Sequence, residues 1–323
     1  MNILVTGAAG FIGASTALEI CKQKHKVIGV DNLNNYYDTR LKNYRLDKLK
    51  NYDNFTFYKL DISNYEALNI IFEDFNIEAV INLAARAGVR YSIIDPLVYY
   101  KTNVTGIINL LELCKLYKVG KFIQASTSSL YAGSKIPFKE SFIADHPLSP
   151  YSSSKKAAEM ACYTYHYLYN IDITVLRYFT VYGPAGRPDM SIFRFIKQID
   201  KDETITIYGD GCQSRDFTYI DDISSGTIKA LDVKGHNIIN LGNNSPNKLF
   251  EIIGKIEKKL NKKARIEYKK FNKADMRDTW ADIGAADTIL KWQPKINIDE
   301  GIEKTVTWYM DNKSFISSIN LVD

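Results

Sequence analysis

Residues 3–13 read Ile-Leu-Val-Thr-Gly-Ala-Ala-Gly-Phe-Ile-Gly, and this stretch decides the fold. Its first three residues form a short run of branched apolar side chains, which is typical of a buried strand. Three glycines follow at once, and helix-forming residues continue over 14–22. The order strand, glycine turn and helix therefore predicts the first unit of an α/β fold.

The glycine turn has the spacing G-x-x-G-x-x-G, in which each glycine has a physical role. Gly7 permits a tight turn, Gly10 lets a ligand approach the backbone, and Gly13 lets the helix pack closely on the strand. The free N–H groups and the positive dipole end of the helix favour a pyrophosphate. We therefore expect a dinucleotide to contact this turn, and the expected residues are Gly7, Gly10, Phe11, Ile12 and Gly13.

The second predicted strand, 26–30, ends at Asp31. An acid about twenty residues beyond the glycines can accept hydrogen bonds from an adenosine ribose, and it would repel a 2′-phosphate, which favours NAD over NADP. The alternative for Asp31 is a helix or turn cap. Further cofactor contacts are expected from Asn32, Asp61, Ile62, Leu83, Ala84, Ala85, Asn103 and Tyr178.

Strands and helices alternate through the first half of the chain. The predicted strands are 3–5, 26–30, 55–60, 79–83, 121–125 and 174–178. Such alternation implies right-handed crossovers and a parallel, doubly wound sheet. We expect a Rossmann-type NAD-binding domain over 1–179, joined by part of 213–240. After a Gly/Pro-rich linker over 180–188, a smaller α/β substrate domain is expected over most of 180–323.

Composition excludes several classes of protein. The apolar share of 46% and the charged share of 24% are those of an ordinary globular protein, and the net charge of +5 is spread along the chain, so we expect no nucleic-acid partner. The four cysteines and four histidines are scattered, which predicts free thiols and no metal site. No apolar run approaches the ~20 residues that span a bilayer, and the N-terminus lacks a signal-peptide pattern, so we expect a cytoplasmic protein without membrane contact.

A second chemical signal is the stretch Pro-Leu-Ser-Pro-Tyr-Ser-Ser-Ser-Lys at 147–155. Prolines stop after Pro150 and helix-forming residues follow, so Tyr151 and Lys155 lie four apart on one helical face. A nearby ammonium favours the phenolate and lowers the pKa of a phenol from ~10. The pair can thus supply a general base at neutral pH. The alternative is a surface tyrosine and lysine at ordinary helical spacing.

Hydroxyl side chains follow the predicted strand 121–125, and they begin with Ser126 and Thr127. Open α/β sheets bind ligands at the carboxyl ends of their strands, so Thr127, Ser128 and Ser129 are candidates for substrate contact. The alternative is a Ser-rich loop. Four arginines are candidates for a phosphate or carboxylate, and each has the alternative of a structural surface charge: Arg90, Arg187, Arg215 and Arg277.

Together these residues resemble the extended short-chain dehydrogenase/reductase family over nearly the whole chain. The resemblance rests on the glycine turn, Asp31, Asp61, residues 82–85, Thr127 and Tyr151-x-x-x-Lys155. More narrowly, the sequence is similar to the UDP-glucuronate 4-epimerases. The similar segments are 31–38, 87–92, 179–184, 186–190 and 215–222.

The resemblance implies a tightly held NAD⁺ and reversible oxidation at C4 of a UDP-sugar. Tyr151 would take the proton of the 4-hydroxyl, Lys155 would bind the nicotinamide ribose and lower the Tyr151 pKa, and Thr127 would hydrogen-bond the reacting oxygen. The 4-keto sugar would turn over and take the hydride back on its other face. The resemblance also implies a homodimer formed through helices 97–116 and 151–169, and a role in polysaccharide biosynthesis.

Local differences from the relatives bear on the substrate. Relatives that eliminate water or lose a carboxylate have Asp or Glu just after the threonine, where this chain has Ser128 and Ser129. Thr180 stands where UDP-glucose/galactose epimerases usually have Asn. These hydroxyls, with Thr127, can converge on a sugar carboxylate, which favours conversion of UDP-glucuronate to UDP-galacturonate. A UDP-glucose or UDP-N-acetylglucosamine 4-epimerase, a decarboxylase or 4,6-dehydratase, and a non-enzymatic NAD-sensing protein remain as alternatives.

Overall fold

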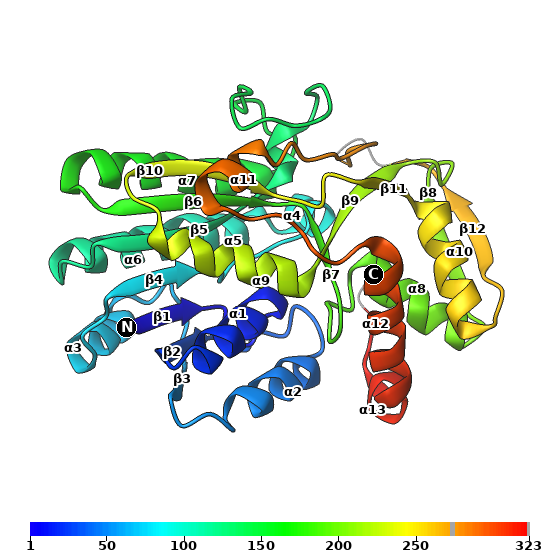
Figure 1. Ribbon diagram of the computed structural model, residues 1–323, viewed down its shortest axis with the longest axis horizontal. Helices are drawn as coiled ribbons and strands as arrows, with labels where there is room; N and C mark the ends of the chain where they lie inside the picture. The colour runs from blue at the N-terminus through cyan, green and yellow to red at the C-terminus, as the bar shows by residue number, and fades with distance from the viewer. Residues whose placement is uncertain (272–274, 322–323) are drawn as a thin grey trace.

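The computed structural model describes residues 1–271 and 275–321, and a parallel seven-stranded sheet forms its centre (Figure 1). The strand order is β10-β6-β5-β4-β1-β2-β3. This sheet confirms the predicted fold class. Its strands are β1 (Asn2–Thr6), β2 (Lys26–Asp31), β3 (Phe55–Lys59), β4 (Ala79–Asn82), β5 (Lys121–Thr127), β6 (Asp172–Tyr178) and β10 (His236–Leu241).

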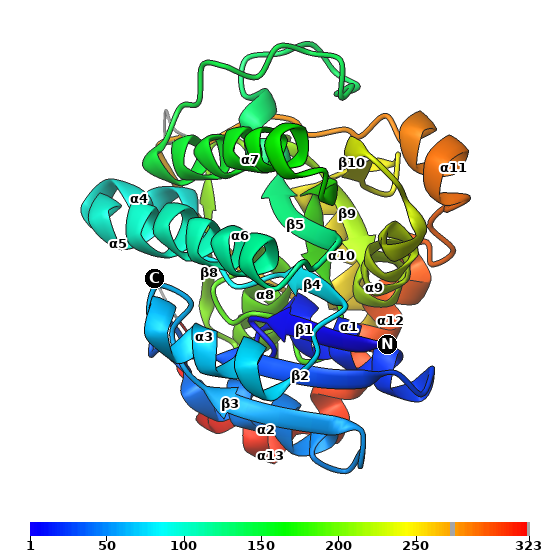
Figure 2. The same ribbon diagram turned by 90° about the vertical axis from the view of Figure 1, so that its left-hand side faces the viewer.

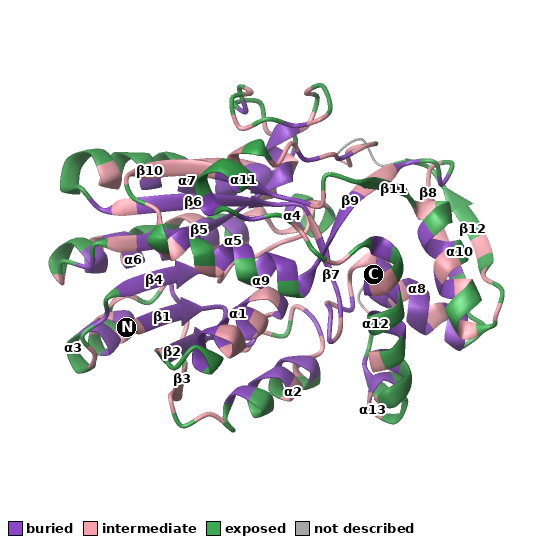
Figure 3. Ribbon diagram, in the orientation of Figure 1, coloured by how far each residue is buried: buried purple, intermediate pink, exposed green. Residues whose placement is uncertain are grey.

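Helices cover both faces of the large sheet. One face carries α1 (Phe11–Lys22), α2 (Thr39–Leu49) and α9 (Ile220–Lys229). The other carries α3 (Tyr65–Asp74), α6 (Gly106–Leu116) and α7 (Pro150–Tyr169). Along β1, Ile3 and Val5 belong to the core on the first face and Leu4 to the core on the second, as the two-residue period of a strand requires. Burial on both faces explains why the strands read as continuous apolar runs, and Figure 3 shows β4, β5 and β6 buried along most of their length.

The strand order reverses between β1 and β4. From β1 the chain winds outward through β2 and β3, and β4 then pairs with the other side of β1. Open α/β sheets bind ligands outside the carboxyl ends of the strands at such a reversal. The fold therefore places a binding site beyond Thr6 and Asn82.

The second half of the chain builds two small sheets beside the large one. One has the order β11-β9-β7, with β7 (Thr180–Tyr182), β9 (Ser214–Tyr219) and β11 (Pro246–Lys248). The other pairs β8 (Thr204–Tyr208) with β12 (Arg265–Lys269). The helices of this half, besides α9, are α8 (Ser191–Asp200), α10 (Leu249–Leu260), α11 (Gly284–Leu290), α12 (Ile298–Asp311), α13 (Lys313–Ser318) and the short 3₁₀ turn η3 (Ala230–Asp232).

Two sequence predictions differ from the structure. The linker predicted over 180–188 begins with a strand, β7, because Val181 and Tyr182 are buried and pair with β9. The helix expected over 97–116 is divided: α5 (Pro96–Tyr100) precedes a π-helical turn, η1 (Lys101–Thr105), and α6 follows. The π-turn contains the buried Asn103, and helix propensity does not predict this interruption.

The remaining short helices lie near the carboxyl ends of β4 and β5. They are α4 (Val89–Ile94) and the 3₁₀ turn η2 (Ser128–Tyr131). Figure 2 shows α4, α5, α6 and α7 next to one another on one side of the large sheet. Among the described residues, no helix has both the length and the apolar character that a membrane crossing requires.

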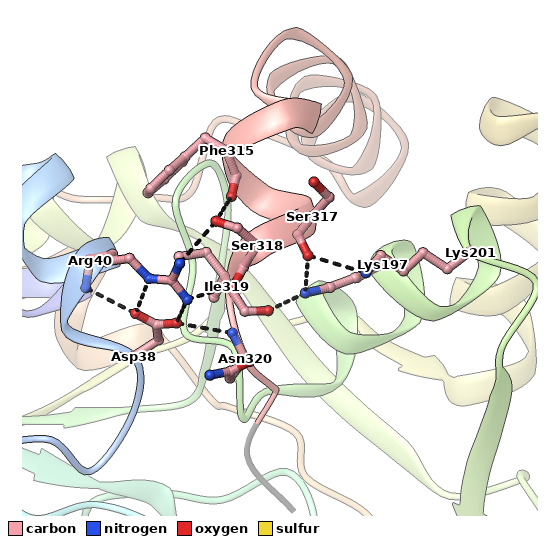
Figure 4. A network of polar contacts seen from close by, with 9 residues as sticks. All are labelled: Asp38, Arg40, Lys197, Lys201, Phe315, Ser317, Ser318, Ile319 and Asn320. Carbon is pink, nitrogen blue, oxygen red and sulfur yellow. Dashed lines mark hydrogen bonds and ion pairs between the residues drawn. The ribbon is translucent and has the colours of Figure 1, made fainter.

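The end of the chain returns to the N-terminal half and forms a C-terminal clasp, residues 313–320 (Figure 4). Arg40, at the start of α2, donates to the Ser318 carbonyl at 2.5 Å, and the Asn320 N–H donates to Asp38 at 3.0 Å. Lys197 of α8 and Lys201, the C-cap of that helix, donate to carbonyls of the same clasp. Cations from two parts of the fold thus satisfy the free carbonyls at the end of α13.

Candidate active site

A cavity of about 590 Å³ lies at the carboxyl ends of the parallel strands. Its lining comes from both halves of the chain: the glycine turn and the ends of β2, β4 and β5 on one side, and β7, β8 and residues within 275–279 on the other. The strand-order reversal predicts this location, and a cavity of this size accommodates a small-molecule ligand.

The glycine turn packs against its surroundings without room for side chains. Gly7 has a φ of +68°, and a Cβ atom on it would lie 2.8 Å from the Ala84 nitrogen. A Cβ atom on Gly13 would lie 2.0 Å from the Gly7 oxygen. Gly10 is the N-cap of α1 and no side chain caps this helix, so its first N–H groups remain available to an anionic group. The turn therefore fits a pyrophosphate.

Asp31 lines the cavity and also braces the glycine turn. One carboxylate oxygen accepts from the Ala9 N–H at 3.2 Å, and the other accepts from the Leu33 N–H at 2.8 Å. Both sequence interpretations of Asp31, a ribose acceptor and a turn cap, are therefore compatible with its position. Nearby, the Asn32 amide donates to Asp61 at 2.7 Å, which fixes two further predicted cofactor residues.

Two buried cations of α2 were missing from the sequence prediction. Lys42 lines the cavity, and its Nζ lies 3.7 Å from the Asp31 Oδ1. Arg45 donates to the carbonyls of Ala9 and of residues 185 and 186, and it therefore connects the glycine turn to the segment before Arg187. The available signal was that both residues share a helical face with the apolar positions 41, 46 and 49.

Tyr151 and Lys155 lie on the first two turns of α7 and face the cavity. The helix begins with Pro150 at its first position, where the missing N–H costs nothing, and Ser149 with Ser152 forms a capping box. Lys155 is buried, and its Nζ donates to the Ala125 carbonyl at 3.0 Å. The pairing predicted from four-residue spacing therefore occurs in a cavity wall and not on an exposed surface.

Burial changes the proton affinities of this pair. It raises the pKa of the Tyr151 phenol, and the Thr127 hydroxyl and the Arg187 charge oppose that rise. Burial also lowers the pKa of Lys155 to about 8, and the Glu159 carboxylate opposes that fall. The resemblance implies that Lys155 also lowers the Tyr151 pKa, and that role stays a prediction.

The hydroxyl cluster lies beside Tyr151. Thr127 ends β5, donates to the Ser129 Oγ at 3.1 Å, and accepts from the Ser129 N–H at 3.1 Å. Ser128 and Thr180 also line the cavity. The residues after Thr127 form a short 3₁₀ turn, η2, and its first residues, Ser128 and Ser129, face the cavity. They therefore do more than form the Ser-rich surface loop of the alternative interpretation.

The predicted arginines have different positions. Arg90 pairs with Asp275 at 2.6 Å and lies over the Tyr208 ring, and Arg187 binds Asp189 in a bidentate pair. Both line the cavity, as does Arg215, whose guanidinium donates to carbonyls of residues 214, 276 and 277. Arg277 is exposed, pairs with Asp210 at 3.0 Å, and lies outside the cavity lining.

Asn103 is the other predicted residue that does not line the cavity. Its amide exchanges two hydrogen bonds with the Arg86 backbone and donates to Ser154 at 2.9 Å. It thus holds the loop after β4 against α7. The lining does contain the other predicted residues, namely Gly7, Gly10, Phe11, Ile12, Gly13, Asp31, Asn32, Asp61, Ile62, Leu83, Ala84, Ala85, Arg90, Thr127, Ser128, Ser129, Tyr151, Lys155, Tyr178, Thr180, Arg187 and Arg215.

Aromatic residues of the lining were also absent from the prediction. Tyr36 and Tyr208 line the cavity beneath the guanidinium groups of Arg187 and Arg90. Tyr99 packs edge-on against Tyr151, with ring centroids 6.1 Å apart. Among the described residues, no group of three or more His, Cys, Asp or Glu side chains is arranged to hold a metal ion.

A Rossmann sheet, a glycine turn and a Tyr-x-x-x-Lys pair in one cavity define an extended short-chain dehydrogenase/reductase. The chain belongs to this family, since the family model described as GDP-mannose 4,6 dehydratase matches residues 4–305. It is 54% identical to the UDP-glucuronate 4-epimerase of Thermodesulfobacterium geofontis (strain OPF15), over 98% of this chain and 99% of that protein.

Two solved structures give the same picture. The UDP-glucuronic acid 4-epimerase from Bacillus cereus, in complex with UDP-glucuronic acid and NAD, has a TM-score of 0.92 at 39% identity and covers 96% of this chain and 99% of its own. The UDP-glucose 4-epimerase from Thermotoga maritima, with UDP-glucose, has a TM-score of 0.90 at 32% identity and covers 97% of this chain and 100% of its own. The similarity therefore extends over both halves of the fold.

Proposed function

We propose that the protein interconverts UDP-glucuronate and UDP-galacturonate by epimerisation at C4 with bound NAD. One observation carries this function: Tyr151, Lys155 and Thr127 lie in the same cavity as a glycine turn built for a pyrophosphate. The 54% identity to a UDP-glucuronate 4-epimerase over nearly the whole chain favours this reaction among those of the family.

The cofactor site follows from the chain's own groups. The N–H groups at the start of α1 would hold the pyrophosphate, Asp31 would accept from the adenosine ribose, and Asp61 with Ile62 would contact the adenine. NAD, when bound, supplies reversible two-electron oxidation at the sugar carbon. Lys155, whose Nζ is fixed on the Ala125 carbonyl, keeps its other N–H groups for the nicotinamide ribose and the Tyr151 oxygen.

Proton transfer is the task of Tyr151. Its oxygen accepts the proton of the sugar 4-hydroxyl during oxidation and returns a proton during reduction. Thr127, which interacts with the Tyr151 hydroxyl, orients the reacting oxygen and shares the proton path. Because the phenol is harder to ionise when buried, Thr127 and Arg187 oppose that cost, and in the proposed mechanism the Lys155 ammonium adds to their effect.

The hydroxyl groups of the cavity suit a carboxylated sugar. Ser128 and Ser129 follow Thr127, and Thr180 lines the same cavity. Short O–H donors bind a carboxylate strongly, and no acid stands directly after Thr127 to carry a proton to or from C5. This arrangement favours retention of the carboxylate and disfavours dehydration or decarboxylation.

We further propose that residues 1–179, with α9 and β10, form the cofactor domain and that most of 180–323 grips UDP. Arg215 and Arg90 are the proposed phosphate contacts, because both line the cavity. Arg277 is not retained as a direct contact. The proposed homodimer uses the outer faces of α6 and α7, where large apolar side chains are exposed: Ile108, Leu116, Met160, Tyr163 and Tyr167. A reducing cytoplasm and a role in polysaccharide supply complete the proposal, and the free thiols of all four cysteines suit such a compartment.

Incubation of the purified protein with UDP-glucuronate, followed by NMR of the products, tests the function. We expect UDP-galacturonate at equilibrium with its substrate, no release of CO₂ and no stable 4-keto sugar. The similarity to a UDP-glucose 4-epimerase makes UDP-glucose the second candidate substrate. A kcat/KM for UDP-glucose equal to or above that for UDP-glucuronate would replace the first candidate by the second.

A further inference from the structure

A buried ion pair lies directly beneath the proposed catalytic residues. Glu159 of α7 and Arg177 of β6 are 1% and 2% exposed. The Arg177 Nε and Nη2 donate to the two Glu159 carboxylate oxygens at 2.9 and 2.7 Å, and the Ser126 hydroxyl donates to one of them at 2.6 Å. Neither charged residue lines the cavity.

Stability alone does not account for this pair. Removing two charges from water is costly, and well-packed apolar residues of similar volume usually replace such a pair without loss of stability. The position of Glu159 is more informative than its burial. It lies one helical turn beyond Lys155, on the same face of α7.

Both side chains of that face hold the end of one strand. Lys155 donates to the Ala125 carbonyl at 3.0 Å, and Glu159 accepts from the next residue, Ser126, at 2.6 Å. Thr127 follows in the chain and carries the hydroxyl that interacts with Tyr151. The end of β5 is thus fixed to α7 at two adjacent residues, immediately before the catalytic threonine.

We propose that Glu159 is a positioning residue for the epimerase reaction: its carboxylate fixes the strand end that carries Thr127 and supplies the negative charge that keeps Lys155 an ammonium. This inference rests on the proposed function. Arg177 holds the carboxylate in place through two hydrogen bonds. The Tyr131 ring lies 4.8 Å from the Arg177 guanidinium and completes the enclosure on that side.

The electrostatic surroundings of Lys155 support this role. Burial lowers its pKa to about 8, and Glu159 is the first of two groups that oppose the fall, the other being Cys162 of α7. The remaining titratable or charged groups around this region are Tyr151 and Lys156 of α7, Arg177 and Tyr178 of β6, Cys114 of α6, Tyr131 of η2 and His236 of β10. Of the acidic groups in this region, Glu159 has the largest electrostatic effect on the Lys155 ammonium.

The decisive variant is Glu159→Gln, which keeps the shape of the side chain and removes its charge. We expect the alkaline limb of the kcat profile to move to lower pH by roughly two units, as for a charge one helical turn away at an effective dielectric of about 20. Glu159→Asp keeps the charge and moves the hydrogen-bonding oxygens, so it should lower kcat and leave the limb in place. Glu257→Gln, on the distant helix α10, should change neither quantity.

A second measurement does not depend on activity. NMR of the protein labelled at lysine Nζ and Cε follows the titration of Lys155, whose signal is assigned by its loss in Lys155→Met. The Lys155 pKa should fall in Glu159→Gln and also in Glu159→Gln/Arg177→Met, which leaves no Arg177 charge without its partner and so covers the case in which the single variant does not fold. An unchanged Lys155 titration and an unmoved limb would overturn the proposal. Absence of epimerase activity in the wild type would instead refute the proposed function, and the NMR result would still decide the role of Glu159.

Discussion

Lys42 Nζ lies 3.7 Å from Asp31 Oδ1 at the cofactor end of the cavity, and both side chains are almost fully buried. Asp31 would repel a 2′-phosphate on the adenosine ribose, whereas Lys42 would attract one. While the ion pair is intact, the Asp31 carboxylate neutralises the Lys42 ammonium and repels a 2′-phosphate. The preference for NAD over NADP should therefore depend on the Asp31 carboxylate.

The first prediction concerns Asp31→Ala. With the carboxylate removed, Lys42 becomes available to a phosphate, so the preference for NAD over NADP should fall by about 10–100-fold, the effect of one charge-assisted hydrogen bond. Calorimetric titration with each dinucleotide measures the ratio. The double variant Asp31→Ala/Lys42→Met should lose affinity for NAD and for NADP. Asp47→Ala, at an exposed site on the helix that carries Lys42, should change neither affinity. An unaltered ratio in Asp31→Ala would contradict this account of selectivity.

The second prediction concerns Tyr151→Phe. This change removes one oxygen and leaves the ring packed against Tyr99, so the fold and NAD content should be retained. Loss of the proton acceptor should lower kcat by about 10²–10⁴-fold. Product formation from UDP-glucuronate is measured by NMR, with Tyr163→Phe on the exposed side of α7 as control. A Tyr151→Phe enzyme with wild-type kcat would remove the tyrosine from the mechanism.

The third prediction concerns Gly13→Ala. The added Cβ would lie 2.0 Å from the Gly7 oxygen, so the glycine turn must shift and the purified protein should lose its NAD. Gly254→Ala is the matched control, since Gly254 is also helical and no atom lies within 4 Å of the added Cβ. That control should keep the cofactor and gain about 0.5–1 kcal/mol of stability. Absorbance of released cofactor and chemical denaturation report the two effects, and full NAD content in Gly13→Ala would contradict the tight fit.

The fourth prediction concerns Arg40→Met at the C-terminal clasp. Loss of the guanidinium frees the Ser318 carbonyl, so hydrogen exchange in residues 313–320 should become at least several-fold faster. Lys50→Met, at the C-cap of the same helix, where Lys50 pairs with Asp47, is the control. Equal exchange in the two variants would show that Arg40 does not hold the clasp.

The clasp should also respond to acid. The Arg40 side chain holds the pKa of Asp38 at about 2, below its ordinary value of 3.8. Because the folded pKa is the lower one, this stabilisation is complete above about pH 4 and is lost as the pH falls towards 2. In Arg40→Met the Asp38 pKa should rise, and the acid transition, followed by intrinsic fluorescence, should begin at higher pH than in the wild type.

Local pattern was sufficient for the fold class, and it selected candidate site residues that the structure brings into one cavity. The glycine turn and the Tyr151–Lys155 pair are encoded within a few neighbouring positions, and short apolar runs locate β1 to β6 of the large sheet. Arg45 and Glu159 could not be predicted in this way, because their partners come from segments far away in the chain. Arg277 failed as a candidate for the same reason: its neighbour Asp210, not its residue type, decides where its side chain lies.

The irregular elements show a similar limit. Helix propensity favours one continuous helix through Asn103, but the demand of the Arg86 backbone for hydrogen bonds produces a π-turn there. Likewise, Gly and Pro near residue 183 suggest a linker, although pairing with β9 makes β7 a strand. In both places tertiary hydrogen bonds outweigh local preference.

The Arg45 guanidinium bonds to the Ala9 carbonyl on one side and to the carbonyls of residues 185 and 186 on the other. It thereby connects the glycine turn, where we expect the dinucleotide to bind, to the segment that carries Arg187. The two segments cannot separate unless several buried hydrogen bonds of Arg45 break together. For the proposed reaction, we therefore expect the 4-keto sugar to turn over beside a fixed cavity wall on the Arg45 side, with any movement of the protein confined to the opposite side.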